Sequence, residues 1–456
     1  MLRGNCVLTE HLIHKYGAAV PRYTSYPTSP HFHDGVDSSV STSWLGKLDK
    51  SNSISLYVHI PYCDRLCWFC ACHTKHTLKY EPIATYLKSL HREVLKVGAH
   101  VSRDARVTAV HFGGGSPTMV KPDDLKALMD CLRASFNFAP NVEISVEMDP
   151  NDLDEGRYDA LAAMGMTRAS LGVQDFDEKV QQTINRIQTF DQTKSVVDAV
   201  RARGVHSVNC DILYGLPHQT LNTLRDTVDQ IISLDPDRIA LFGYAHVPWM
   251  KKHQTMIPED ALPDVMERYR QMTMAADMLV ASGYVAVGID HFAKPDDKLA
   301  VALKNGVLKR NFQGYTDDCA DALIGLGASA IGKLPQGYVQ NMPATGEYER
   351  MADGDGLCVV RGIALSDADR VRGFVIEKIM CDFAIDLTAL CAMYGSVGHG
   401  VATEARDFAM RDRDGLVVIE DGIFRLLDAG KPFARSIAAT FDTYLSNGRG
   451  RHSVAV

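Results

Sequence analysis

Four cysteines stand close together at Cys63, Cys67, Cys70 and Cys72, in the segment HIPYCDRLCWFCACH. Thiols at such spacing can form disulfides or bind a metal, and the rest of the chain helps to decide between the two. The chain has 11 cysteines, an odd number, and most of them lie in ordinary-looking helices and strands. That distribution is typical of free thiols in a reducing compartment. The cluster is therefore predicted to be a metal site in a cytoplasmic protein.

The spacing of the first three cysteines, C-x3-C-x2-C, bears on which metal they bind. A structural zinc site usually has four ligands in two C-x2-C-like pairs, and no second pair follows here. Zinc stays open as an alternative because His59, His73 and His76 could complete a tetrahedron. Three thiolates on a tight loop suit a cubane iron–sulfur cluster whose fourth iron is open to another ligand. An open metal position can coordinate a substrate, so the spacing favours a catalytic site.

Length and composition fit a soluble globular protein. The chain has 456 residues, of which 46% are hydrophobic and 23% charged, which is enough for two or three domains of roughly 150 residues each. The net charge of −8 argues against a nucleic-acid-binding surface, which would need a basic stripe. The first residues lack the apolar run of a signal peptide, and no apolar stretch of about 18 residues predicts a membrane span. We expect neither nucleic acid nor membrane as a partner.

Strand-like runs alternate with helical stretches through much of the chain. The first run, Ser53 to Ile60, precedes the cysteine loop and an amphipathic stretch from Tyr86 to Val97. Further strand-like runs, each before a helical stretch, lie at residues 106–112, 142–148, 168–173, 206–216 and 238–246. Such a series of six β/α units indicates an α/β fold with a parallel sheet, either partly closed into a barrel or open and doubly wound. In both arrangements functional groups gather beyond the carboxyl ends of the strands.

The predicted strand ends are polar in every unit. They carry the cysteine loop, GGGSPT (113–118), Glu147 with Asp149, Gln174 with Asp175, Asp211, and the segment 244–246. Alternation along the third strand puts Glu147 on its polar face, near the end. Any one of these carboxylates alone would indicate a solvated strand end. Their recurrence around one rim instead predicts a functional site.

The cysteine spacing after the first strand of such a series resembles the radical S-adenosylmethionine (SAM) superfamily. The chain is similar in particular to the oxygen-independent coproporphyrinogen III oxidases, through PRYTSYPT, LYVHIPYC, GGGSPT, EMDP, GVQDF, DILYGLP, YAH, DHFAKPDD, RNFQGYT and FDTYL. The resemblance implies a partial parallel (β/α)6 barrel. It also implies an N-terminal arm over residues 1–50, a catalytic domain over 51–365 and a small, mostly helical C-terminal domain over 366–456.

The resemblance implies a 4Fe-4S cluster bound by Cys63, Cys67 and Cys70, with one SAM molecule on the open iron and a second nearby. The positions that match contacts of the first SAM molecule are Tyr57, Gly114, Glu147 and Ile331. The positions that match contacts of the second are Phe69, Gly115, Ser116, Gln174, Arg186, Asp211 and Ala245. Without the family match, Arg186 would be interpreted as a solvated helix residue.

The cysteine loop holds one further cysteine besides the implied cluster ligands, and two positions differ from the family pattern. Cys72 matches a further cysteine of the true oxidases, so a catalytic or substrate-side role is a hypothesis, with an inert buried thiol as the alternative. Ser116 and Ala71 depart from the family pattern, because threonine and glycine are usual there. Serine keeps the hydroxyl group. Ala71 would be strained only if its backbone required a positive φ.

The implied reaction is the oxidative decarboxylation of two propionates of coproporphyrinogen III to vinyl groups, which gives protoporphyrinogen IX in haem biosynthesis. A 5′-deoxyadenosyl radical made from SAM would take a hydrogen from the propionate β-carbon. The resemblance implies a monomer that receives electrons from a flavodoxin- or ferredoxin-like reductant. The arm around Tyr23 to Tyr26 and the loop RNFQGYT are candidate lids, with plain packing as the alternative.

The sequence leaves open an alternative function and the choice of cations that bind the substrate. A haem-binding chaperone is the alternative function, although that class lacks the cysteine matching Cys72 and the PRYTSYPT arm. A tetracarboxylate substrate needs cations, because buried charge must be paired. The candidates are Arg22, Lys294, Lys309, Arg310 and Arg361, and the sequence does not choose among them.

Overall fold

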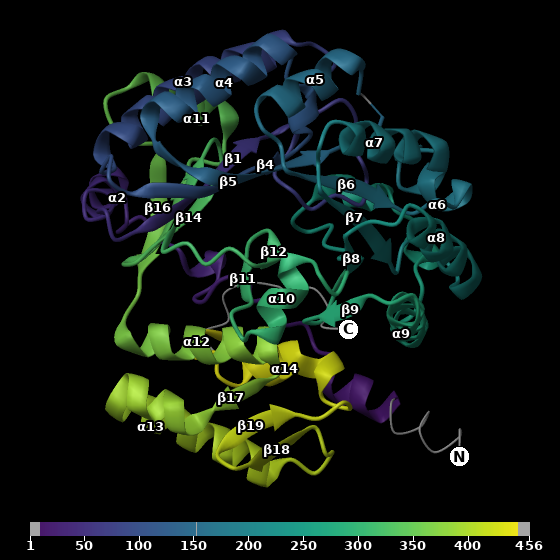
Figure 1. Ribbon diagram of the computed structural model, residues 1–456. Coiled ribbons are helices and arrows are strands. Elements are labelled where there is room, and N and C mark those ends of the chain that lie inside the picture. Colours follow the sequence, from purple (N-terminus) through teal and green to yellow (C-terminus); the bar gives the residue numbers. More distant parts are fainter. Residues whose placement is uncertain (1–9, 152, 446–456) are drawn as a thin grey trace.

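The computed structural model describes residues 10–151 and 153–445. Its largest element is a twelve-stranded sheet with the order β16-β15-β14-β13-β1-β4-β5-β6-β7-β8-β10-β9 (Figure 1). The central parallel strands are β1 (Ser53–Ile60), β4 (Arg106–Gly114), β5 (Asn137–Met148), β6 (Arg168–Gln174), β7 (Ser207–Tyr214) and β8 (Arg238–Gly243). These are the six strands that the sequence predicts, so the α/β fold with six β/α units is confirmed.

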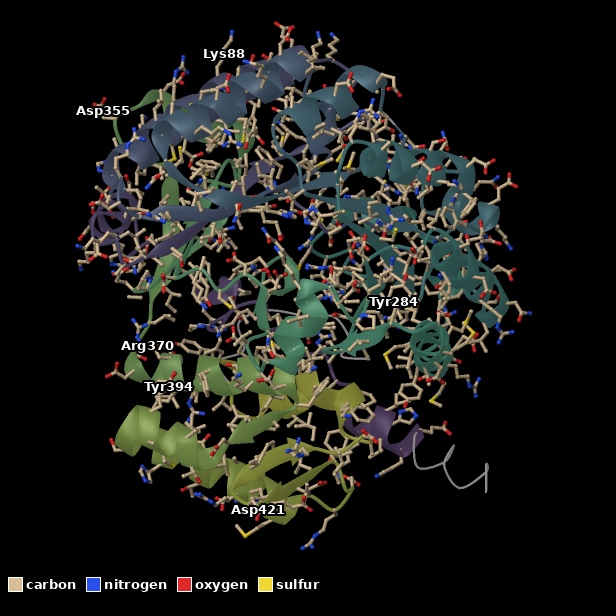
Figure 2. All side chains as sticks on the ribbon, viewed as in Figure 1. Lys88, Tyr284, Asp355, Arg370, Tyr394 and Asp421 are labelled. Carbon is tan, nitrogen blue, oxygen red and sulfur yellow. The ribbon has the colours of Figure 1, made fainter. Side chains whose placement is uncertain are left out.

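Both edges of the sheet are extended by strands that the sequence analysis did not identify. At one edge β13 (Ala322–Leu326) pairs with β1 as a seventh parallel strand. Three antiparallel strands continue this edge: β14 (Ile331–Leu334), β15 (Gly337–Asn341) and β16 (Val359–Ala364). At the other edge are the antiparallel strands β10 (His291–Ala293) and β9 (Val285–Val287). Just before β9, the Tyr284 hydroxyl donates to Pro236 O at 2.7 Å and fixes this edge (Figure 2).

Helices that follow the parallel strands cover the outer side of the sheet (Figure 1). They are α3 (Glu81–His100), α4 (Pro122–Ser135), α5 (Glu155–Ala163), α6 (Glu178–Thr183), α7 (Phe190–Ala202), α8 (Leu221–Ser233) and α9 (Val265–Ala281). Helix α2 (Ser38–Leu45) lies before the sheet in the chain, and α11 (Thr345–Asp353) packs on α3. The predicted periodicity of α3 is confirmed, because Leu87, Leu90, Val94 and Val97 are all buried in the main core. No helix within the described residues is long and apolar enough to cross a membrane.

The last part of the chain has a hydrophobic core of its own. Helices α12 (Asp367–Asp382), α13 (Leu387–Arg411) and α14 (Ala434–Ala439) pack on a three-stranded antiparallel sheet of β17 (Ala384–Asp386), β18 (Val417–Glu420) and β19 (Ile423–Leu426). The predicted, mostly helical C-terminal domain thus has its helices, and it also contains a three-stranded sheet that was not predicted. Between this part and the large sheet lie α10 (Lys298–Lys304) and the hairpin of β11 (Lys309–Asn311) and β12 (Gly314–Thr316) (Figure 1). Arg370 of α12, labelled in Figure 2, donates to Pro335 O at 2.8 Å and so links this part to the large sheet.

The N-terminal arm is fastened to the C-terminal helices. Tyr23 and Tyr26 are buried in the second core. The Tyr23 hydroxyl donates to Asp442 at 3.0 Å, and Arg435 of α14 donates to the carbonyl oxygen of Val20 at 2.6 Å. The arm therefore packs against the C-terminal part of the chain. The predicted domain boundaries at residues 50 and 365 stay a prediction.

A buried carboxylate ties α3 to the strands at the sheet edge. Glu93 is 1% exposed and accepts hydrogen bonds from Gly327 N at 2.7 Å, Asn341 Nδ2 at 2.5 Å and the Tyr348 hydroxyl at 2.5 Å. Burial raises the pKa of Glu93 to about 7, although these three donors oppose the shift. The folded protein thus holds a proton on Glu93 at a pH where the unfolded chain has released it.

This pKa shift predicts a pH dependence of stability. The pKa of Glu93 in the folded protein lies above its ordinary value of 4.5. The contribution of Glu93 to the free energy of unfolding is therefore fully present below this ordinary pKa and decreases as the pH rises to about 7. The loss is on the order of 3 kcal/mol. Denaturant unfolding at about pH 5 and about pH 8 should show a smaller difference for Glu93→Gln than for wild type. Glu81→Gln, at an exposed position of the same helix, is the control and should keep the wild-type difference. Equal differences in all three proteins would contradict the prediction.

Candidate active site

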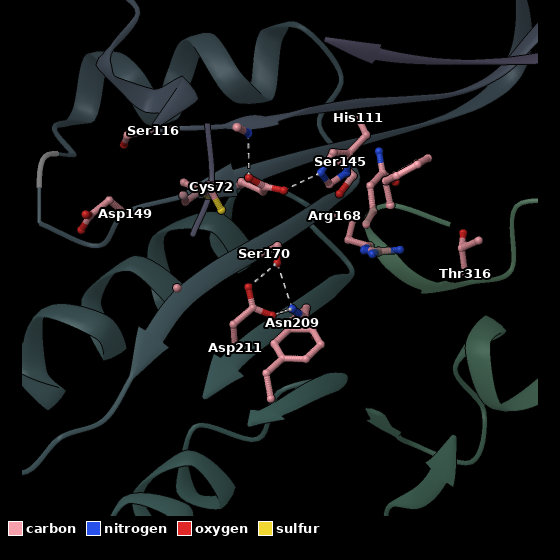
Figure 3. A pocket seen from close by; sticks show the side chains of 18 of the residues that line it. Cys72, His111, Ser116, Ser145, Asp149, Arg168, Ser170, Asn209, Asp211 and Thr316 are labelled. Atoms are coloured by element: carbon pink, nitrogen blue, oxygen red, sulfur yellow. Dashed lines mark hydrogen bonds and ion pairs between the residues drawn. The ribbon is translucent and has the colours of Figure 1, made fainter. Parts of the chain in front are cut away.

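The carboxyl ends of the parallel strands open into a cavity of about 460 Å³. Each central strand contributes to its wall, for example through Ser55 of β1, His111 of β4, Glu147 of β5, Ser170 of β6, Asp211 of β7 and Phe242 of β8. Figure 3 shows polar side chains from neighbouring strands pointing into the same space. The cysteine loop adds Cys63, Cys67, Cys70 and Cys72 to the lining. This is the rim that the sequence predicts as the functional site.

The cysteine loop is held by hydrogen bonds to its backbone. At its two ends β2 (Tyr62–Cys63) pairs with β3 (Lys75–His76). The loop carbonyl oxygens accept from the side chains of a segment after β8: Lys251 donates to Cys72 O at 2.7 Å, His253 to Cys70 O at 2.7 Å and Gln254 to Phe69 O at 2.8 Å. Ala71 is not among the described residues with positive φ, so the departure from glycine causes no strain there.

The thiols of the loop differ in their environment. Burial raises the pKa of the Cys63 and Cys67 thiols, whereas the hydrogen bond between the side chains of Cys72 and Cys70 lowers the pKa of Cys70 to about 7. Within the described ranges, no group of three His, Cys, Asp or Glu residues is arranged to hold one metal ion. The ligands of a cubane bind different irons and need not meet at one point.

Arg186 lies directly behind the cysteine loop. Its Nη1 is 3.6 Å from Cys67 Sγ and 3.1 Å from Asp149 Oδ2, and its Nη2 donates to the carbonyl oxygen of Gly172. Burial opposes the charge, yet Asp149 and Cys67 together raise the pKa of the guanidinium group. Arg186 is 7% exposed, so it is a buried cation beside a predicted cluster ligand and not a solvated helix residue.

Glu147 at the end of β5 is held as a carboxylate. It accepts from Gly114 N at 2.9 Å and from His111 Nε2 at 3.0 Å, as the dashed lines in Figure 3 show. Burial opposes ionisation, but His111 and the Gly114 amide lower the pKa of Glu147. Its oxygens are thereby fixed at the cavity wall, where a carboxylate can accept hydrogen bonds from an amino or hydroxyl group.

A buried histidine positions Tyr57 beside this carboxylate. Burial lowers the pKa of His59 to about 4, so the ring is neutral. Its Nε2 donates to His73 O at 3.0 Å, since a carbonyl oxygen only accepts. The other nitrogen, Nδ1, then accepts from the Tyr57 hydroxyl at 3.0 Å. The Tyr57 ring in turn stacks on His111 with ring centroids 5.8 Å apart.

The GGG motif at the end of β4 is required by close packing. Gly114 has φ +110°, and a Cβ atom at this position would lie 2.5 Å from His59 Cε1. At Gly113 a Cβ atom would lie 2.7 Å from Glu147 Oε1. Both contacts are shorter than atoms allow, so a larger residue would displace the two side chains that support the wall.

Gly114→Ala is expected to weaken SAM binding by the reconstituted protein at least about tenfold. The substitution places a methyl group against His59 in a backbone conformation that favours glycine, and so shifts the Gly114 amide away from Glu147. Equilibrium binding of SAM and the thermal midpoint would measure the effect. Gly400→Ala is the control, because no atom lies within 4 Å of its added Cβ. Wild-type SAM affinity in the Gly114 variant would contradict this role.

Several buried polar atoms of the cavity wall have no hydrogen-bond partner among the described residues. They are Ser145 Oγ, Arg168 Nε, Arg186 Nε, Arg238 Nη1 and Gln313 Nε2. Buried polar groups normally have hydrogen-bond partners. Several buried polar atoms without partners in one cavity wall are typical of a site where a bound ligand supplies them. Together with three thiols on one loop, they fit an iron–sulfur cluster and a polar, charged cofactor such as SAM.

Gln174 and Asp211 stand at irregular points of the wall. The register between β6 and β7 shifts near Gln174, which has φ +73°, an uncommon conformation that often marks functional sites. Asp211 accepts from Asn209 Nδ2 at 2.8 Å and Ser170 Oγ at 3.5 Å (Figure 3). Burial raises the pKa of Asp211 to about 6. Strand alternation could have identified Asn209, because it lies two residues before Asp211 on the same face.

The cavity brings together most of the residues predicted to contact SAM. Its lining includes Phe69, Gly114, Gly115, Ser116, Glu147, Gln174, Arg186 and Asp211. Tyr57, Ala245 and Ile331 are not among the lining residues. Cys72 is exposed and lines the cavity, so it is not a buried thiol. The roles of all these residues stay predictions.

The parallel sheet with a cysteine loop after its first strand is the arrangement of one large class of enzymes. Residues 57–231 match the profile of the radical SAM superfamily. Members of this superfamily bind a 4Fe-4S cluster and SAM. The solved structure of coproporphyrinogen III oxidase from Escherichia coli, described as a radical SAM enzyme, matches with a TM-score of 0.89 and 34% identity over 95% of this chain and 98% of that chain.

Curated relatives narrow the class to one family. Two proteins named oxygen-independent coproporphyrinogen III oxidase are similar over almost the whole chain. The protein from Bradyrhizobium diazoefficiens is 44% identical over 96% of this chain and 97% of its own length. The protein from Paracoccus denitrificans is 45% identical over 97% of both chains. This chain therefore belongs to the family of oxygen-independent coproporphyrinogen III oxidases. None of these relatives is named as a haem carrier, so the chaperone alternative gains no support.

Proposed function

We propose that this protein oxidatively decarboxylates two propionates of coproporphyrinogen III to vinyl groups and so produces protoporphyrinogen IX for haem biosynthesis. The observation that carries the proposal is the cavity at the strand ends, where three thiols and Arg186 face polar groups from every central strand. The family to which the chain belongs supports the choice of substrate.

In this proposal Cys63, Cys67 and Cys70 hold the cluster, which together with SAM supplies a 5′-deoxyadenosyl radical. The chain's own groups bind and orient the cofactors. Glu147, fixed by His111 and Gly114, would accept from the amino or ribose groups of one SAM molecule. Arg186 would pair with the carboxylate of a second SAM molecule, and Asp211 would accept from ribose hydroxyls.

The hairpin of β11 and β12 supports the proposed exclusion of water. Phe312, Gln313, Tyr315 and Thr316 of this hairpin line the cavity, and so does Arg22 of the arm. Arg310 on the hairpin donates its Nε to the carbonyl oxygen of Arg22 at 3.4 Å, so the arm and the hairpin meet at the cavity mouth. Together they would shield a radical from solvent. Cys72, which also lines the cavity, would face the substrate.

The proposal extends to partners and location. A flavodoxin- or ferredoxin-like protein would reduce the cluster, and the enzyme would act as a monomer in the cytoplasm. The odd number of cysteines, 11 in the chain, supports a reducing compartment.

The test is anaerobic. The protein is reconstituted with iron and sulfide, reduced, and given SAM and coproporphyrinogen III; 5′-deoxyadenosine and protoporphyrinogen IX are then measured. Both products would support the proposal. Deoxyadenosine without the vinyl product would keep a radical enzyme but overturn the substrate. Haem binding with neither product would favour the chaperone.

A further inference from the structure

A second cavity of about 710 Å³ adjoins the first one. The two cavities share Arg22 and Phe242 in their linings and so meet at these side chains. The second cavity lies between the sheet edge formed by β8, β9 and β10 and the C-terminal part, to which Phe383 and Arg435 belong. None of the cofactor-binding roles proposed for this protein uses the second cavity.

Four arginines, Arg22, Arg268, Arg310 and Arg435, line the second cavity. Arg22 donates Nη2 to Gly243 O at 3.0 Å, and Arg268 donates Nη2 to Tyr244 O at 3.0 Å. Arg310 is 9% exposed, and its Nη1 has no hydrogen-bond partner within the described part of the chain. These guanidinium groups bond mainly to backbone carbonyl oxygens, which do not neutralise their charge.

The acids of this cavity do not balance the arginines. Asp290 is half-buried, 3.8 Å from Arg310 Nη1 and hydrogen-bonded to His291 at 2.7 Å. Asp428 pairs with Lys431 at 2.7 Å, and Asp277 is exposed. Arg435 also lines the cavity. Burial lowers the pKa of Arg22, of Arg268 and, to about 10, of Arg435, so a bound anion would recover part of the cost of holding these charges.

The rest of the wall is largely apolar. Its side chains include Phe242, Met272, Ala276, Val280, Ile289, Phe292 and Leu303. Apolar walls with a few convergent charged groups are typical of a site for an organic ligand, and the volume lies in the usual range. An apolar macrocycle with carboxylate arms has the matching chemistry.

The other cations that the sequence suggests for the substrate are used elsewhere. Lys294 pairs with Asp235 at 2.9 Å, and Lys309 pairs with Glu377 at 2.9 Å. Arg361 donates to Gln340 Oε1 at 2.7 Å. None of the three lines either cavity. The structure therefore selects Arg22 and Arg310 from that set and adds Arg268 and Arg435, which the sequence analysis did not identify.

We propose that the second cavity holds the tetrapyrrole macrocycle, with Arg22, Arg268 and Arg310 binding the carboxylates of propionates that are not reacting. The reacting propionate then reaches the first cavity past Arg22 and Phe242. This inference rests on the proposed function and deepens it, because it assigns the substrate's carboxylates to named residues. Arg22 stands at the junction, so it contacts a propionate next to the reacting one.

The test uses Arg22→Met, Arg268→Met and Arg22→Lys in the reconstituted protein, with Arg361→Met as the control of matched chemistry. The readouts are KM and kcat for coproporphyrinogen III and the Kd of the stable oxidised macrocycle coproporphyrin III without SAM. Each methionine variant should raise KM and Kd about tenfold to one-hundredfold, with kcat less affected. Arg22→Lys should recover part of the loss, and the control should stay within about twofold of wild type.

A ligand-side comparison keeps the test valid if a variant fails to fold. The tetramethyl ester of coproporphyrin III lacks the carboxylates and should bind wild-type protein at least about tenfold more weakly than the free acid. Unchanged Kd values in folded Arg22→Met and Arg268→Met, or equal binding of ester and acid, would overturn the inference while leaving the proposed function intact. A third outcome is that the wild type consumes no coproporphyrinogen but binds coproporphyrin III, and that the methionine variants lose this binding. The proposed function would then be wrong, and the carboxylate site would be supported.

Discussion

Replacing Cys67 by alanine is expected to reduce 5′-deoxyadenosine and protoporphyrinogen formation to background. Cys67 is 9% exposed and lies between the other cysteines of the triplet, with its sulfur 3.6 Å from Arg186 Nη1. Its loss leaves the loop two of the three thiolates that a cubane with one open iron requires. The variant should also retain less iron and sulfide after reconstitution, which gives a readout that does not depend on turnover.

Two other cysteines supply the controls for this experiment. Cys131 of α4 is half-buried and does not line the cavity, so Cys131→Ala should keep iron content and both products. Cys72 lines the cavity but is not predicted as a ligand, so Cys72→Ala should keep the cluster even if it loses the vinyl product. If Cys72→Ala loses iron and Cys67→Ala keeps it, the predicted ligand set is wrong.

The fold was largely predictable because the six central strands are strand-like runs separated by helical stretches, and the helix after the first strand has a clear period. The six strands and the helix periodicity of α3 follow from those local signals alone. Strand β13, Ala322–Leu326, could not be found in this way, since its parallel partner β1 is distant in sequence. The strands β17 and β9 are three residues long, which is too short to show a period of two.

The candidate site was predictable where it lies at strand ends. Glu147 and Gln174 belong to the ends of predicted strands, Asp211 lies within one, and the cavity wall contains all three. Ser170 and Arg168 lie earlier in their strand, and their part in the wall depends on which face of the sheet turns inward. A single strand gives the alternation but does not tell which face lines a cavity.

The cations illustrate what a sequence does not contain. From the sequence alone, Lys294 and Arg22 are equally plausible partners of a substrate carboxylate. In the folded chain Lys294 is paired with Asp235, whereas Arg22 reaches the junction of two cavities. Arg268 looks like an ordinary residue of an amphipathic helix, and only the crossing of α9 under Tyr214 and Tyr244 turns it toward the second cavity.

Arg186→Met is expected to destabilise the protein by about 3 to 5 kcal/mol and to lower SAM-dependent activity on the order of one-hundredfold or more. Asp149 is 9% exposed and loses the cation 3.1 Å away, so a buried carboxylate is left without a counter-charge beside Cys67. The substitution also removes the donor to the carbonyl oxygen of Gly172, next to the bulge at Gln174. Denaturant unfolding and deoxyadenosine formation measure the two effects.

The double variant Arg186→Met with Asp149→Asn separates the buried charge from the other contacts of the arginine. If the unpaired carboxylate causes most of the destabilisation, the double variant should recover at least about half of it. Activity should not recover, because the cation next to Cys67 Sγ is still absent. Recovery of both would mean that Arg186 only neutralises Asp149. Recovery of neither would mean that its bond to Gly172 O, and hence the shape of the strand end, dominates.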